Sequence, residues 1–266
     1  DGGTTLIVNT DSEYSYLGRL VITFDDEGNL DADSLNESLS GAYAASDENV
    51  EQYFDGDAFA EGTKGGAVLE ITQAIQEIVE AKDGNVYGFT DVYLEGDRAF
   101  VRNQETNLGN LSADANLTAA REALDDGAYV VSLKNGGGIR AQIGAVSTEG
   151  GAAVKIPPLA NPDAGKPEGG VSQLDVENSL RFNNRLVVLE LTPENLKAAL
   201  EQGVSVFGNQ GRFPQIGGVR FSFDATAPAG SRISDIALID ENDNLLLALY
   251  DDGVLVSGAP STINVV

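Results

Sequence analysis

A glycine-rich segment near the middle of the chain carries residue types that bind anions. Asn135 precedes three glycines that include Gly137 and Gly138, and Arg140 ends the segment. An asparagine amide donates and accepts hydrogen bonds, and arginine presents a planar fork that suits phosphate or carboxylate. We expect the glycines to adopt positive φ angles and to let a ligand approach closely. The alternative is a glycine-rich turn whose arginine forms a surface ion pair.

Two further arginines, Arg98 and Arg102, lie four positions apart. Residues 98–102 are predicted to form a short strand, in which side chains at i and i+4 point to the same face. Two guanidinium groups on one face could grip a phosphate through paired hydrogen bonds. The alternative is a pair of surface salt bridges, each contributing about 0–1 kcal/mol.

An aromatic residue, Phe182, precedes a strongly apolar run over 186–191 that predicts a strand. A phenylalanine in this place usually belongs to the core. Because Asn183 and Asn184 follow it, the ring is also a candidate stacking surface for a planar ligand, with Asn184 as a polar contact.

The charge balance of the chain limits its partners. Its 266 residues contain 42 acidic and 16 basic residues, giving a formal net charge of −26. Such a chain repels phosphates, so we expect no nucleic-acid partner. No apolar run approaches the roughly 20 residues needed to cross a bilayer, so we expect no membrane insertion.

The chain lacks histidine, cysteine, methionine and tryptophan, and the first two absences limit its chemistry. The chain has no histidine, which excludes a Ser-His-Asp triad, a Cys-His pair and an HExxH zinc site within it. It has no cysteine either, so no disulfide can form.

The pattern along the chain predicts a mixed α/β (α+β) fold, rich in sheet with outer helices. The clearest helix is predicted over 67–82, where apolar residues recur at helical spacing, as an interdomain hinge or a core helix. Residues 31–66 read as an acidic connector, in which Asp55 and Asp57 also suggest a calcium site. Residues 147–170 are rich in glycine and proline and predict a surface insertion.

Four segments together resemble the C-terminal domain of the 5'-nucleotidase family. They are VRNQETNLGNLSADA (101–115), NGGGIRA (135–141), SLRFNN (179–184) and GRFPQIGG (211–218). The resemblance covers residues 67–266 and suggests a domain that is incomplete at its C-terminus. Residues 1–30 resemble the last strands of the same family's metallophosphoesterase domain, which is otherwise missing.

The resemblance implies a nucleotide- or phosphoester-recognition part of a secreted phosphohydrolase, extracellular or periplasmic. In that family a two-metal N-terminal domain performs the chemistry. The expected partner of this chain is therefore the missing metallophosphoesterase domain, which would hold a divalent metal pair. By the same resemblance, Arg98, Arg102, Asn135 and Arg140 contact substrate, Phe182 stacks on the base, and Asn184 adds a polar contact.

Two departures from the family pattern shape the expected activity. Without histidine the two-metal site cannot be built in this chain, so we expect the chain alone to be inactive and to need no cofactor of its own. A second stacking aromatic would follow residue 266, so we expect weak nucleotide binding. A different function remains open: a non-catalytic acidic extracellular module that keeps the fold as a surface or assembly protein.

Overall fold

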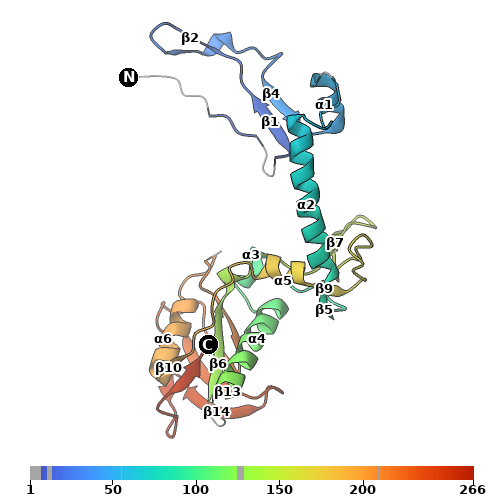
Figure 1. Cartoon of the computed structure of the whole chain (residues 1–266). Helices are drawn as coiled ribbons and strands as arrows, with labels where there is room; N and C mark the ends of the chain where they lie inside the picture. The colour runs from blue at the N-terminus through green and yellow to red at the C-terminus, as the bar shows by residue number, and fades with distance from the viewer. Residues whose placement is uncertain (1–6, 11–13, 55, 125–128, 209) are drawn as a thin grey trace. The chain divides into compact units, whose positions relative to one another are not determined.

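The computed structural model describes residues 7–10, 14–54, 56–124, 129–208 and 210–266. The chain forms two compact units, Asp1–Glu77 and Ile78–Val266. Helices and strands alternate through the larger unit, so the expected mixed α/β class is confirmed (Figure 1).

The first unit consists of short strand pairs and helical segments. Its strands pair β1 with β4 and β2 with β3, both antiparallel. No described apolar side chain of this unit is buried. Its elements are β1 (Tyr16–Arg19), β2 (Thr23–Phe24), β3 (Leu30–Asp31), the 3-10 turn η1 (Ala32–Ser34), β4 (Gly41–Ala44) and α1 (Asp47–Tyr53).

The long helix α2 (Lys64–Gly84) confirms the helix predicted over 67–82 and extends it at both ends. Its predicted apolar face is exposed: Val68 is 60% exposed, Ile71 62% and Ile75 55%. Within this chain, therefore, α2 is not the core helix that its spacing allowed.

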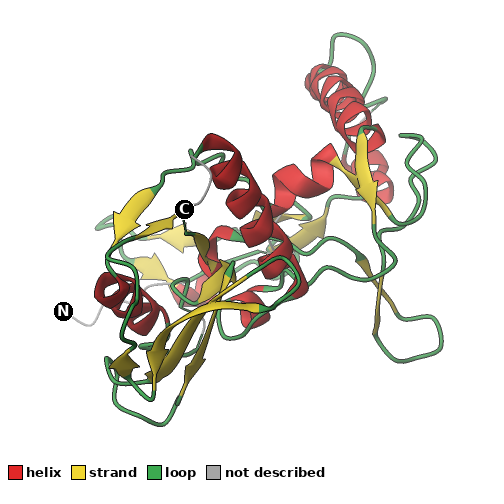
Figure 2. Ribbon diagram, turned by 90° about the horizontal axis from the view of Figure 1, so that it is seen from below, coloured by secondary structure: helices red, strands yellow, loops and turns green. Residues whose placement is uncertain are grey.

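The second unit contains the remaining elements, seen by secondary structure in Figure 2. One sheet has the order β10-β16-β6-β11, a second has the order β12-β13-β14-β15, and β5 pairs with β9 and β7 with β8. The strands are β5 (Val86–Phe89), β6 (Val130–Asn135), β7 (Ala145–Ser147), β8 (Val154–Ile156), β9 (Gly170–Ser172), β10 (Leu189–Leu191), β11 (Pro214–Gly217), β12 (Val219–Phe223), β13 (Ile233–Ile239), β14 (Leu245–Asp251), β15 (Val254–Leu255) and β16 (Ile263–Val265). The helices are α3 (Arg98–Val101), α4 (Asn107–Ala123), the 3-10 turn η2 (Gly136–Gly138), α5 (Gln173–Ser179) and α6 (Pro193–Gly203).

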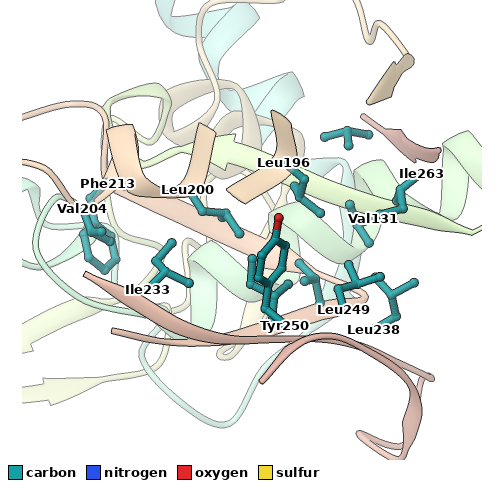
Figure 3. Close-up of a cluster of buried hydrophobic side chains, with 13 residues drawn as sticks. Val131, Leu196, Leu200, Val204, Phe213, Ile233, Leu238, Leu249, Tyr250 and Ile263 are labelled. Atoms are coloured by element: carbon teal, nitrogen blue, oxygen red, sulfur yellow. The ribbon is translucent and has the colours of Figure 1, made fainter. Parts of the chain in front are cut away.

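Strand β6 lies between two packed layers, with α4 and α6 on either side of it in Figure 1. Successive strand residues face opposite ways. Accordingly, Val130 packs with Leu117 of α4, whereas Val131 joins Leu196 and Leu200 of α6 in the main core. Figure 3 shows this main core, which also includes residues of β13, β14 and β16. The carboxyl end of β6, where the glycine-rich segment begins, is thus fixed from both sides.

Local signals set the start of α6. The Thr192 hydroxyl accepts a hydrogen bond from the Asn195 amide at 3.3 Å, and Pro193 occupies the first turn. Threonine at the N-cap followed by proline is a favoured helix start, because both satisfy or remove unpaired amides.

The glycine- and proline-rich stretch 147–170 is only partly a surface insertion. Its first half forms the β7–β8 hairpin, whose described residues are exposed or half-buried, in agreement with the predicted surface insertion. Its second half turns inward, since Lys166 is 7% exposed and Pro158 is buried. The prediction of a surface insertion is therefore wrong for the residues around Lys166.

Lys166 is the centre of a buried polar cluster, here called the Lys166 network. Its Nζ donates to Asp83 Oδ1 at 2.9 Å and to Asp175 Oδ2 at 2.6 Å. Asp83 also accepts from Ser172 Oγ at 2.7 Å and from Asn161 Nδ2 at 2.8 Å. The network joins the last turn of α2 to the start of α5.

Two further expectations concern ions and membranes. Asp55 lies outside the described residues, and the described ranges contain no group of three or more acidic, histidine or cysteine side chains arranged to hold a metal ion. Among the described helices, none combines the length and apolar character that crossing a bilayer requires.

Candidate anion-binding site

Arg98 begins the short helix α3 and Arg102 directly follows its last residue, so the predicted strand over 98–102 is wrong. The N-cap of the helix is Asp97, whose carboxylate accepts a hydrogen bond from the Ala99 amide at 2.6 Å. Arg102 ends the helix and keeps a right-handed backbone, with φ −101° and ψ 0°. Because residues four apart also neighbour each other on a helix, the two arginines still share a face.

The glycines after β6 serve close packing rather than unusual backbone angles. Residues 136–138 form η2, and none of the three has a positive φ, which corrects the expectation from sequence. A Cβ on Gly136 would lie 1.8 Å from the Val101 carbonyl oxygen, far inside contact distance. Gly136 therefore allows this turn to press directly against α3, which carries Arg98 and leads to Arg102.

Gly137 and Asn135 attach the turn to Gly211. The Gly137 amide donates to the Gly211 carbonyl at 2.9 Å, and Asn135 Nδ2 donates to the same oxygen at 3.2 Å. A Cβ on Gly138 would meet Asn135 Oδ1 at 3.5 Å, an ordinary contact. Gly138 is thus the glycine beside which space is left.

Arg140 is held at its backbone and at its guanidinium. Its amide donates to the Ser179 carbonyl at 2.8 Å, at the end of α5, and its Nη1 lies 3.4 Å from the Gly137 carbonyl. The Ser179 hydroxyl in turn donates to the Ala141 carbonyl at 2.7 Å. Helix α5 therefore fixes the point at which Arg140 leaves the turn.

The three arginines act on one another. Burial lowers the pKa of Arg102, and the like charges of Arg98 and Arg140 lower it further. Coulomb interactions of this kind require the charges to lie close together. Arg98 and Arg140, from two separate segments of the chain, thus lie near enough to Arg102 for their charges to act on it; Arg102 is buried and the other two are exposed.

An exposed aromatic ring borders the arginines. The Arg140 Cζ atom lies 5.5 Å from the centre of the Phe182 ring, and Phe182 is 54% exposed. The ring is therefore not part of the core. Asn184 follows two residues later, is exposed, and makes no hydrogen bond to these residues in the part of the chain that the structure describes.

One cationic neighbour was not singled out from the sequence. Lys134 immediately precedes Asn135, and its Nζ lies 4.0 Å from the place of a Cβ on Gly138. Burial lowers the pKa of Lys134. Its position next to an Asn-Gly-Gly-Gly turn was the signal available in the sequence.

A cleft of about 760 Å³ lies between α4 and β12, but the acidic side chains in its walls would repel a phosphate. Its walls include Asp114, Asp240 and Asp243, with Arg121 as a counter-charge. Burial raises the pKa of Asp114, and the charge of Asp243 raises it further. The arginine face is therefore the better site for an anion.

Comparison with known proteins identifies the family of this chain. The family model described as "5'-nucleotidase, C-terminal domain" matches residues 86–251. This chain belongs to the 5'-nucleotidase C-terminal domain family. All of the candidate site residues lie within the matched range.

Individual relatives agree with the family match. The trifunctional nucleotide phosphoesterase protein YfkN of Bacillus subtilis (strain 168) is 31% identical over 249 residues, which cover 93% of this chain and 14% of that protein. Snake venom 5'-nucleotidase of Crotalus adamanteus is 27% identical, over 90% of this chain and 35% of the relative. The crystal structure of a 5'-nucleotidase precursor from Thermus thermophilus superposes with a TM-score of 0.55 at 31% identity, covering 94% of this chain and 39% of that one. The chain thus spans well under half the length of each of these relatives.

Proposed function

We propose that this chain is the nucleotide-recognition part of a larger 5'-nucleotidase-like phosphohydrolase. The observation that carries the proposal is that Arg140 lies beside the exposed Phe182 ring while its charge, with that of Arg98, acts on the buried Arg102. Guanidinium groups bind phosphate oxygens in pairs, and an exposed ring offers a stacking face to a base.

In this proposal the ligand spans two contacts. Arg102 and Arg140, with Arg98, bind the phosphate. Phe182 stacks on one face of the base.

Polar groups would complete the site. Asn135, Gly137 and Gly138 border the ligand, and Asn184 reaches its polar edge. The names of relatives, which include a nucleotide phosphoesterase and a 5'-nucleotidase, support this function over a non-catalytic acidic surface module.

The chemistry would belong to another part of the larger protein. A divalent metal pair requires a cluster of ligands, but this chain has no histidine, and its described residues offer no group of three or more candidate ligands. These residues do not fit a two-metal site, so we assign the metals to a metallophosphoesterase domain that partners residues 67–266.

The first unit is the surface that such a domain would cover. Its described apolar side chains are all at least partly exposed, including Leu17 at 72% and the α2 residues Val68 and Ile71. Exposed apolar patches of this kind mark contact surfaces. We accordingly assign residues 1–30 to the edge of that domain and residues 31–66 to the connector.

We also infer that the larger protein is exported, to the periplasm or the cell exterior. The occurrence of a relative in snake venom supports export. Fractionation of source cells, with detection of this segment in the exported fraction, tests the inference. Recovery only from the cytosol would contradict it.

Isothermal titration with AMP and adenosine tests the main proposal. AMP should bind more tightly than adenosine, because only AMP offers a phosphate to the arginines. Arg140→Ala should remove this difference, since a hydrogen bond to a charged group contributes about 1.5–3 kcal/mol. Arg220→Ala, at an exposed arginine of β12, serves as the matched control and should leave it unchanged.

Two results would count against the proposal. One is no heat from AMP at millimolar concentration, and the other is equal affinity for AMP and adenosine. A chelator added to the titration should leave AMP binding unchanged, because the phosphate contacts proposed here need no metal.

A further inference from the structure

A buried amide side chain outside the proposed contact surface holds the segment that carries Arg102. Gln215 lies in β11 and is 1% exposed. Strand β11 pairs with β6, and Gln215 lies opposite Lys134, one residue before the glycine-rich turn. Gln215 is therefore attached to the same sheet that presents Arg140.

The Gln215 amide bonds to the backbone on both sides of Arg102. Its Nε2 donates to the Val101 carbonyl at 3.0 Å and to the Gln104 carbonyl at 2.8 Å. Its Oε1 accepts from the Thr106 amide at 3.2 Å. A primary amide has two donor hydrogens and an acceptor oxygen, so both ends of this side chain are engaged.

Close packing leaves this amide little room to move. A Cβ on Gly109 would lie 1.9 Å from Gln215 Oε1, so any larger residue at that position of α4 would displace the Gln215 amide. Thr106, whose backbone amide donates to Gln215 Oε1, is also the N-cap of α4. Gln215 thus ties the end of α3, the connecting segment and the start of α4 to β11.

We propose that Gln215 is a positioning residue for Arg102, and through it for the phosphate of the ligand. Without the amide, the segment 102–105 loses the contacts that set where it leaves α3. The position of the Arg102 guanidinium would then no longer be fixed. The inference rests on the proposed function for the identity of the ligand, but not for the effect on Arg102 itself.

The first test separates positioning from general damage by comparing two ligands. Gln215→Met keeps the length of the side chain and removes its polar atoms. AMP affinity should fall by about tenfold, whereas adenosine affinity should stay unchanged because adenosine has no phosphate. Leu200→Ala, in the main core, is the control for lost stability. It should leave the ratio of the AMP and adenosine affinities unchanged.

Two companion variants sharpen this test. Gln215→Glu in its protonated form keeps one donor and one acceptor, so it should lose less AMP affinity than Gln215→Met. In an Arg102→Ala background, Gln215→Met should cause no further loss, since the two residues act as one unit. Equal weakening of AMP and adenosine, or additive losses in the double variant, would overturn the proposal.

The second test needs no nucleotide. The Nε–H resonance of Arg102 in an NMR spectrum should shift in Gln215→Met and in Gln215→Glu, and its hydrogen exchange should accelerate by about tenfold. Arg232, whose Nε donates to the Ala227 carbonyl at 2.9 Å, provides the internal reference and should not change. An unchanged Arg102 signal would overturn the inference. If wild-type protein fails to prefer AMP but the Arg102 signal responds as expected, the proposed function fails while the positioning role stands.

Discussion

Two charged clusters in the second unit are built on opposite principles. In the Lys166 network, opposite charges meet and every named partner belongs to the chain. In the arginine cluster, like charges meet, and Arg98 and Arg140 lower the pKa of Arg102 after burial has already lowered it. The first arrangement stabilises the fold. In the second, the repulsion between like charges works against folding, and an anion bound beside them would reduce that repulsion.

The pKa directions in the network show that attraction outweighs burial. Burial alone would raise the pKa of Asp83, but hydrogen bonds from Asn161, Ser172 and Lys166 lower it. Burial alone would lower the pKa of Lys166, but hydrogen bonds to Asp175 and Asp83 raise it. Both shifts favour the charged forms, so each charge in the folded state is stabilised by its neighbours.

Removing the central cation should have the largest effect on stability. Lys166→Met would leave the Asp83 and Asp175 carboxylates without their shared cation. Breaking a buried ion pair by removing one partner costs about 3–5 kcal/mol. Urea unfolding followed by circular dichroism measures the loss.

Lys197→Met is the matched control for that experiment. Lys197 lies in α6, with its Nζ 4.6 Å from the centre of the Tyr250 ring. A cation–π contact of this kind contributes about 0.5–1 kcal/mol. If Lys166→Met cost no more than this control, the network would not be the stabilising cluster described above.

The ring beside the arginines should show the reverse pattern, with binding affected and stability not. Phe182→Ala should weaken both AMP and adenosine by about 1–3 kcal/mol, the contribution of one stacking face. Because Phe182 is 54% exposed, its removal should change the free energy of unfolding by less than about 0.5 kcal/mol. Calorimetry and urea unfolding on the same sample measure the two quantities.

Phe89→Ala provides the comparison for the ring. Phe89 is 71% exposed on β5 and lies outside the proposed contacts. Phe89→Ala should change neither the AMP affinity nor the adenosine affinity. Unchanged adenosine affinity in Phe182→Ala would remove the ring from the site.

The network also predicts how stability depends on pH. Because the folded pKa of Asp83 lies below its ordinary value of 3.8, its contribution is present above that value and is lost as the pH falls through the folded pKa. Because the folded pKa of Lys166 lies above 10.5, its contribution is present below that value and is lost as the pH rises through the folded pKa.

Urea unfolding across a pH series measures both limbs. Asp83→Asn should flatten the acid limb, and Lys166→Met should flatten both, since Asp83 then loses its cation. An acid limb of the same steepness in Asp83→Asn would assign the acid sensitivity to other carboxylates.

Local signals in the sequence were sufficient for several elements. Thr192 and Pro193 mark the start of α6, and the alternation of Val219, Phe221 and Phe223 marks β12. The Asn-Gly-Gly-Gly-Ile-Arg order also pointed to a turn after a buried strand. In each case the sequence signal lies within a few consecutive residues.

Other features depend on contacts between distant segments, which no local pattern records. The helix α3, which replaces a predicted strand, has its end packed against Gly136, 35 positions after Val101. Lys166 is buried because Asp83, 83 positions earlier, receives its ammonium. Gln215 was visible within a family-like motif, but its role depends on Val101, 114 positions earlier.

The smallest expected effect tests most directly whether the arginines are assembled for a ligand. Arg98 and Arg102 are like charges four positions apart, and such pairs destabilise a helix by about 0.2–0.5 kcal/mol. Arg98→Gln should therefore raise the free energy of unfolding by about that amount and at the same time weaken AMP binding. Urea unfolding and titration calorimetry measure the two changes.

The informative result is a gain in the free energy of unfolding together with a loss of AMP affinity. If Arg98 served only stability, its replacement would lower both quantities or change neither. Arg220→Gln, which removes an exposed arginine from β12, should change neither quantity. A ligand that binds the folded state raises the free energy of unfolding more when it binds more tightly. Adding phosphate should therefore stabilise wild-type protein more than Arg98→Gln and narrow the difference between them. If Arg98→Gln instead lowered the free energy of unfolding, repulsion between Arg98 and Arg102 would not destabilise the folded state.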